Sequence, residues 1–224
     1  MCTFSLRPYV LAATLFAGTI SGFAQDNLVN SLKVNASDNS KASFKFTEVI
    51  NLQNTSVKNQ GSSGTCWSYS ANSFLESEMA RMGKQPVEIS QIFSARNTYI
   101  EKGKMYVRMH GAVTLGDGGS LYDVINMYKK YGAVPQSVYT GLNYGTDKNK
   151  FGEMAQITES ILQAVVKNPN GELTPNWQTA YAAVIDSYLG QVPENFDYNG
   201  KKYTPQTFAK EVIGINADDY IQIS

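Results

Sequence analysis

Histidine and cysteine are scarce in this chain, which has one histidine and two cysteines among 224 residues. Zinc sites need three or four protein ligands drawn mainly from these residue types. We therefore expect neither a metal nor another cofactor. The cysteines are Cys2 and Cys66, and Cys2 lies in a segment that we expect to be removed on export. Cys66 then has no partner for an intramolecular disulfide.

An excess of charge is also missing, because 19 Lys and Arg residues are balanced by 19 Asp and Glu residues. The sequence contains no basic stripe and no block of like charge, so we expect no binding to nucleic acid. A hydrophobic fraction of 42% is ordinary for a folded protein. The composition thus favours a globular chain without a polyanionic partner.

A hydrophobic run long enough to span a membrane is the third absence. The apolar run 10–20 is shorter than the roughly 20 residues that a spanning helix needs. Arg7 precedes this run and the small-x-small sequence Gly22-Phe23-Ala24 follows it, which is typical of a signal peptide. We expect cleavage after Ala24, a periplasmic or secreted location, and no stable membrane insertion of the mature chain. An uncleaved anchor is the alternative.

The stretch around Cys66 is the most informative part of the sequence. Residues 60–65 are polar turn formers, and from Trp67 onward apolar residues recur every three to four positions, which predicts a helix from Cys66 to Gly83. Backbone N–H groups at a helix start carry partial positive charge and favour the thiolate, the form that attacks carbonyl carbon. Cys66 is therefore predicted to be a nucleophile. The alternative is a buried, inert cysteine.

Capping residues and glycines predict the other elements. Ser90 begins a helix that closes at Gly103, and Ser120 begins one that closes at Gly132. The connection 104–115 is predicted to be irregular or extended. Further helices are expected over 151–166, 175–189 and 205–213, and short strands over 44–50 and 219–223.

The sequence Gly116-Asp117-Gly118-Gly119 has two interpretations. Taken alone, it favours a tight turn before the helix that Ser120 begins. The alternative is a backbone segment that another group approaches closely, because glycine has no Cβ.

These motifs resemble the papain superfamily of cysteine peptidases, specifically its bleomycin hydrolase and aminopeptidase C branch. Gln60-Gly61-x-x-Gly64-x-Cys66-Trp67 is similar to the family's nucleophile motif, with the oxyanion-hole glutamine six residues before the cysteine. Ser63 stands where papain itself has a disulfide-bonded cysteine, which points to the disulfide-free branch. Two later stretches extend the resemblance: the glycine sequence 116–119 with the helix ending Tyr131-Gly132-Ala133-Val134-Pro135, and the segment from Tyr203-Thr204-Pro205 to Tyr220.

The resemblance implies an α+β, papain-like peptidase fold, represented mainly by its helical lobe with a helical insertion, the strand-rich lobe being largely missing. It divides the chain into a signal peptide (1–24), a flexible or extended arm (25–43), a helical lobe with the nucleophile (44–145) and a helical insertion leading toward the missing lobe (146–224).

The resemblance also implies a cysteine-type aminopeptidase that forms a thioester acyl-enzyme at Cys66. Gln60 would belong to the oxyanion hole, and Gly118 and Gly119 would bind the peptide substrate. The family's catalytic histidine and asparagine lie further downstream, so His110 is predicted to be a loop residue and the chain a fragment. The full-length protein would be a homo-oligomer if it follows the family. The alternatives are a non-catalytic helical domain that binds a partner, and another thiol enzyme such as an acyltransferase.

Overall fold

The computed structural model describes residues 47, 49, 54–169, 171–221 and 223. The chain divides into two compact units, 1–50 and 51–224, and the described elements belong to the second. The predicted signal peptide, arm and nearly all of the strand candidate 44–50 lie outside the described residues. The elements in chain order are α3 (Cys66–Arg81), α4 (Gln91–Arg108), α5 (Leu121–Tyr131), α6 (Gly152–Val166), α7 (Asn176–Leu189), β1 (Phe196–Tyr198), β2 (Lys201–Tyr203), α8 (Pro205–Phe208), the π-helical turn Ala209–Ile213 and the 3₁₀ turn Ala217–Asp219.

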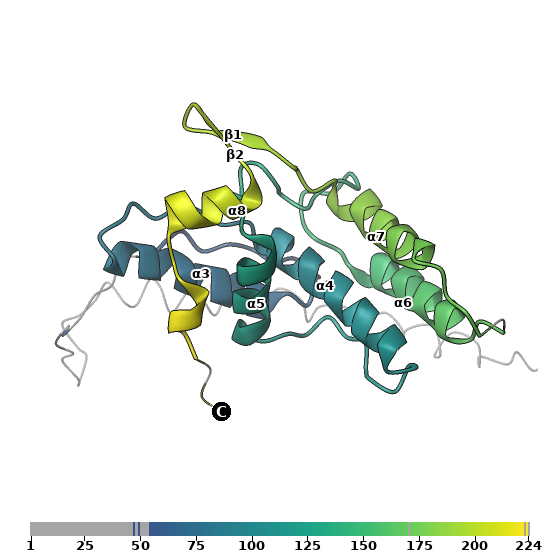
Figure 1. The fold of residues 1–224 in the computed structure, drawn as a ribbon. Helices are drawn as coiled ribbons and strands as arrows, with labels where there is room; N and C mark the ends of the chain where they lie inside the picture. The colour runs from purple at the N-terminus through teal and green to yellow at the C-terminus, as the bar shows by residue number, and fades with distance from the viewer. Residues whose placement is uncertain (1–46, 48, 50–53, 170, 222, 224) are drawn as a thin grey trace, which may run out of the picture. The chain divides into compact units, whose positions relative to one another are not determined.

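Helix α4 is the centre of the helical unit, in contact with α3, α5, α6 and α7 (Figure 1). Phe93 of α4 is buried in one core with Leu75 of α3, Val124 of α5, Leu162 of α6 and Ile185 of α7. Each of these helices buries an apolar stripe, and α4 is buried on most of its surface. The predicted helical character of the chain is confirmed.

The predicted end of α4 at Gly103 is wrong, because the helix continues to Arg108 and includes the first part of the connection expected to be irregular. A Cβ atom on Gly103 would lie 2.6 Å from Cε1 of Tyr181 on α7. The Tyr181 hydroxyl donates a hydrogen bond of 3.1 Å to the carbonyl of Tyr99. Gly103 therefore permits the close approach of α7 to α4 and does not end the helix.

The predictions that Ser90 and Ser120 cap the starts of α4 and α5 are confirmed. The Ser90 hydroxyl accepts a 3.1 Å hydrogen bond from the N–H of Phe93. Ser120 and Asp123 form a reciprocal capping box, in which the Ser120 N–H donates to the Asp123 carboxylate at 2.7 Å. Helix α5 then ends before Gly132, whose φ of +76° is unfavourable for a residue with a side chain.

The predicted helix over 205–213 is confirmed, with a wider final turn than expected. Thr204 caps it and Pro205 occupies its first turn. Its last five residues form a π-helical turn, and the Tyr128 hydroxyl donates to the carbonyls of Ala209, at 2.8 Å, and Ile215, at 3.2 Å. This tyrosine joins α5 to the C-terminal elements.

The strands differ from the prediction. The candidate 219–223 is wrong: Asp219 ends a 3₁₀ turn, and Tyr220, Ile221 and Ile223 are in no strand. The observed sheet is an antiparallel hairpin that pairs Phe196–Tyr198 with Lys201–Tyr203. No helix in the described part of the chain is long and apolar enough to cross a membrane.

Candidate active site

Cys66 is the first residue of α3, and its side chain is exposed. The carbonyl of Thr65 accepts the N–H groups of Ser68 and Tyr69 at 2.8 and 3.1 Å, so the helix begins directly at the cysteine. Cys66 is therefore not a buried cysteine. The proposed role of Cys66 as a nucleophile stays a prediction.

The nucleophile loop (residues 60–65) precedes Cys66 and is held from the side by the segment 149–151. The Ser62 N–H donates to the Asn149 carbonyl at 2.8 Å, and the Phe151 N–H donates to the Ser62 carbonyl at 3.1 Å. Gly61 has a φ of +63°, and a Cβ there would lie 2.4 Å from the same Asn149 carbonyl oxygen. A glycine is required at this position by both conformation and space.

Gln60 begins this loop and is partly buried. Its carbonyl accepts a 2.8 Å hydrogen bond from the hydroxyl of Ser63, which is fully buried. The loop therefore has a defined shape between Gln60 and Cys66. The oxyanion role of the Gln60 amide stays a prediction.

The glycine loop (residues 116–119) lies against the start of α3. The indole Nε1 of Trp67 donates a 2.8 Å hydrogen bond to the Asp117 carbonyl. A Cβ on Gly119 would lie 2.6 Å from the Trp67 ring, and one on Gly64 would lie 2.5 Å from the Asp117 Cβ. The close approach that was the alternative for this stretch is found at Gly119, where the approaching group is Trp67, the residue after Cys66. Gly118 instead faces open space, with no heavy atom within 4 Å of a built Cβ.

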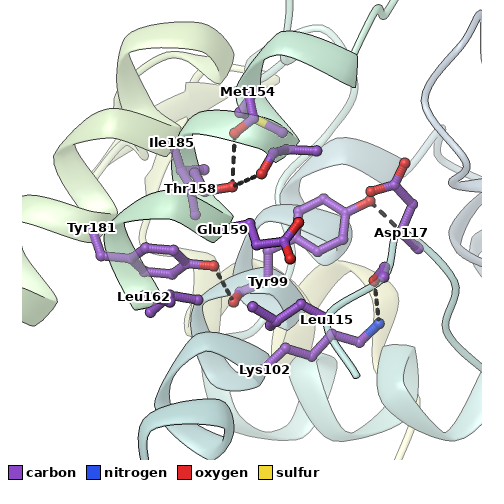
Figure 2. A pocket seen from close by; sticks show the side chains of 12 residues that line it. Tyr99, Lys102, Leu115, Asp117, Met154, Thr158, Glu159, Leu162, Tyr181 and Ile185 are labelled. Atoms are coloured by element: carbon purple, nitrogen blue, oxygen red, sulfur yellow. Dashed lines mark hydrogen bonds between the residues drawn. The ribbon is translucent and has the colours of Figure 1, made fainter. Parts of the chain in front are cut away.

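Two residues of α4 hold the glycine loop, and the sequence did not reveal either of them. Lys102 donates from Nζ to the carbonyl of Gly116 at 3.0 Å (Figure 2). It also donates to the carbonyl of Gly118. The Tyr99 hydroxyl donates to the Asp117 carbonyl at 3.4 Å. Burial raises the pKa of Asp117, an effect that the neighbouring Lys102 opposes. Burial also disfavours the charged form of Lys102, and for this ammonium it lowers the pKa.

A small cavity of about 70 Å³ borders the glycine loop, and Gly116 and Asp117 are among its lining residues (Figure 2). Its walls are mainly apolar and aromatic, with Lys102, Asp117 and Glu159 among its lining residues. Burial raises the pKa of Tyr99, which lines it, well above the usual tyrosine range. The apolar side chains that line it are Leu115, Met154, Leu162 and Ile185.

A buried carboxylate supports the chain segment that leads to the nucleophile loop. Glu76 of α3 is fully buried and accepts hydrogen bonds from the Ile89 N–H, at 2.7 Å, and from the Thr55 hydroxyl. Lys58 lies 3.4 Å from the same carboxylate and 3.6 Å from the exposed Glu88. These contacts join residues 55 and 58 to α3, the helix that carries Cys66.

His110 lies in the exposed turn after α4, with a φ of +52°. The prediction of a loop residue is confirmed. Within the described residues, no group of three or more His, Cys, Asp or Glu side chains is placed to hold a metal ion.

No protein-family model matches this chain. Several curated proteins do match it. Aminopeptidase C of Lactobacillus delbrueckii subsp. lactis is 25% identical, over 92% of this chain and 54% of the relative, and that of Streptococcus thermophilus is 22% identical, over 80% and 48%. Mitochondrial cysteine proteinase 1 of Saccharomyces cerevisiae is 27% identical over 57% of this chain and 29% of the relative. The chain is thus similar to aminopeptidase C proteins, the branch of the papain superfamily that its sequence motif resembles.

The crystal structure of PepW from Lactobacillus rhamnosis HN001 shares this fold. It matches 97% of this chain and 58% of its own with a TM-score of 0.57, at 21% identity. The papain-like fold class is thereby supported, in a chain whose described residues are mostly helical with one two-stranded sheet. The chain spans about half the length of the aminopeptidase C relatives it matches.

Proposed function

We propose that this chain supplies the nucleophile-bearing part of a cysteine peptidase of the aminopeptidase C branch, which removes residues from peptide N-termini. The observation that carries the proposal is the exposed Cys66 at the start of α3, beside a glycine loop that rests on Trp67. A nucleophile at a helix start and an adjacent backbone segment without side chains are what an extended peptide substrate requires.

In the proposed reaction, the Cys66 thiolate attacks the scissile carbonyl carbon. A tetrahedral oxyanion forms, and its collapse expels the amine and leaves a thioester on Cys66, which water then hydrolyses. The Gln60 side-chain amide and the Cys66 backbone N–H are the proposed oxyanion donors. Loss of such a donor typically costs about 10²–10³-fold in rate.

Gly118 is the proposed contact for the substrate main chain, because its Cα faces open space. Gly119 would lie beside it and holds the loop against Trp67. A side chain at position 118 would obstruct an extended peptide without disturbing the protein itself.

The reaction also needs a base that takes the thiol proton and later protonates the leaving amine. His110 is exposed in the turn after α4, and we do not assign it this role. We propose that an imidazole from the second lobe of the papain-like fold supplies it, in a longer protein of which this chain is a part. By itself, the chain should bind and be alkylated by peptide-like reagents, with little turnover of amides.

The experiment is the labelling of Cys66 with a dipeptidyl chloromethyl ketone, in which the thiolate displaces chloride. The proposal predicts a rate that saturates with reagent concentration, competition by free dipeptide, and no labelling of Cys66→Ser. Iodoacetamide, which carries no peptide, should react without saturation. If the labelling rate instead rises linearly with the concentration of the peptidyl reagent and free dipeptide does not lower it, the result would support a non-catalytic domain with an ordinary exposed thiol.

Export is a separate part of the proposal, because residues 1–24 lie outside the described residues. The mature protein should begin at Gln25 and be recovered outside the cytoplasm. N-terminal sequencing of the purified native protein checks this, and an intact Met1 to Ala24 segment would contradict it.

A further inference from the structure

The carbonyl oxygens of three successive residues in the glycine loop are all bound by side chains of α3 and α4. Lys102 Nζ donates to Gly116 and Gly118 on either side, while the Trp67 indole donates to Asp117 between them at 2.8 Å. The Tyr99 hydroxyl also reaches the Asp117 carbonyl, at 3.4 Å. The main chain of the loop is thus fixed from the protein side, and Gly118 keeps an open face.

Lys102 holds the outer two of these three positions. Its Nζ also lies 6.0 Å from the centroid of the Trp67 ring, at the outer limit of a cation–π interaction with the residue after Cys66. A partly buried ammonium that donates to backbone carbonyls makes charge-assisted hydrogen bonds, which are stronger than neutral ones. Leu115 and the small cavity lie beside Lys102 (Figure 2).

We propose that Lys102 is a positioning residue that fixes the glycine loop for peptide binding. It acts on substrate affinity through the loop and takes no part in the chemistry at Cys66. The inference rests on the proposed function, since it assumes that the loop binds a peptide main chain. The loop anchoring itself can be measured without any peptide.

The first measurement is the hydrogen exchange of the Trp67 indole N–H, which donates to Asp117. Lys102→Met keeps the aliphatic length but removes the donor, and it should speed this exchange by about tenfold, because a hydrogen bond from a charged group is lost at each end of the loop. Trp177, the only other tryptophan, is the internal control. Lys104→Met is the matched control variant, because Lys104 pairs with Glu101 at 2.8 Å and not with the loop.

The second measurement is the labelling of Cys66 by the dipeptidyl chloromethyl ketone. In Lys102→Met the half-saturating concentration should rise by about tenfold, while the limiting rate and the iodoacetamide rate stay unchanged. Lys102→Arg, which keeps a charged donor, should restore most of the affinity. Lys104→Met should behave as the wild type in all three quantities.

The outcomes separate the two proposals. Unchanged indole exchange in Lys102→Met, or unchanged half-saturation where the wild type saturates, overturns the positioning role alone. A wild type that shows no saturation overturns the proposed function, and the substrate role of Lys102 with it. Equal losses in Lys102→Met and Lys104→Met show a general effect on α4 and also overturn the inference.

Discussion

At the scale of single residues, Glu76 is the buried charge on which the approach to the nucleophile loop depends. It accepts hydrogen bonds from the Ile89 N–H and the Thr55 hydroxyl and pairs with Lys58. Removing one partner of a buried charge network leaves the others without compensation, which is costly, whereas an exposed ion pair contributes little.

We therefore expect Glu76→Ala to lower the free energy of unfolding by about 3 kcal/mol. Glu88→Ala is the matched control, since Glu88 is an exposed carboxylate 3.6 Å from the same Lys58, and its removal should cost less than about 1 kcal/mol. Urea unfolding of both variants gives the two values. Equal losses would show that the burial of Glu76 has no energetic consequence.

Two adjacent glycines of the loop separate a structural role from a substrate role. Gly119→Ala places a Cβ about where the Trp67 ring lies, and it should destabilise the protein by about 1–3 kcal/mol through overpacking. Gly118→Ala meets no atom within 4 Å, so its unfolding midpoint should be unchanged or slightly higher.

In the labelling experiment, the variant expected to show an effect is Gly118→Ala, the one whose stability should not fall. Gly118→Ala is expected to raise the half-saturating concentration of the peptidyl reagent while its iodoacetamide rate stays the same. If Gly118→Ala leaves peptidyl labelling unchanged, no substrate lies against this residue and its assignment to the substrate site is wrong.

The cysteine, the glycine loop and the loop position of His110 could be predicted from the sequence because local patterns mark them. Turn formers before a helical periodicity place Cys66 at a helix start, and a run of glycines marks a close approach. Lys102 and Glu76 could not be predicted in this way. Their partners are 13 to 21 residues away, as in Glu76 with Ile89 and Thr55, and no local pattern identifies them.

At the scale of the elements, α4 shows how tertiary packing overrides a local signal. Gly103 is a reasonable helix end by sequence alone. In the structure it lies within α4 because Tyr181 occupies the space of its missing side chain. The hairpin illustrates the opposite case. Asn199-Gly200, with φ of +49° and +78°, is a strong local signal for a two-residue turn and joins the two observed strands, whereas the candidate strand 219–223 does not form.

Gly103→Ala tests whether helix propensity or overpacking dominates, because the two change the stability in opposite directions. Helix propensity alone predicts stabilisation by about 1 kcal/mol. The 2.6 Å approach to the Tyr181 ring predicts a net loss of about 1–3 kcal/mol by overpacking, and we expect the loss to prevail. Thermal unfolding of the variant shows whether its stability rises or falls.

Gly152→Ala is the control for this substitution. Gly152 is the first residue of α6 and has no atom within 4 Å of a built Cβ, so alanine there should stabilise the protein or leave it unchanged. Stabilisation of the Gly103→Ala variant to the same extent would show that α7 does not pack against α4 at this position.

At the scale of the whole molecule, the described helices α3, α5, α6 and α7 gather around α4, with the Cys66 thiol at the start of α3. The family relationship could be predicted from the nucleophile motif and is supported by aminopeptidase C relatives and by the PepW fold. The division of the chain at residue 145 stays a prediction. The activity remains our proposal, since the chain covers about half of these relatives.

The central claim is that Cys66 forms a thioester with an acyl group, and an aminoacyl p-nitrophenyl ester tests it most directly. This activated ester releases p-nitrophenolate without a general acid, so acylation does not depend on the imidazole that we propose for the second lobe. We predict a burst of one equivalent of p-nitrophenolate per chain and a matching aminoacyl mass increase on Cys66, both absent from Cys66→Ala. A burst no larger than that of Cys66→Ala, or an acyl group on another residue, would contradict the account.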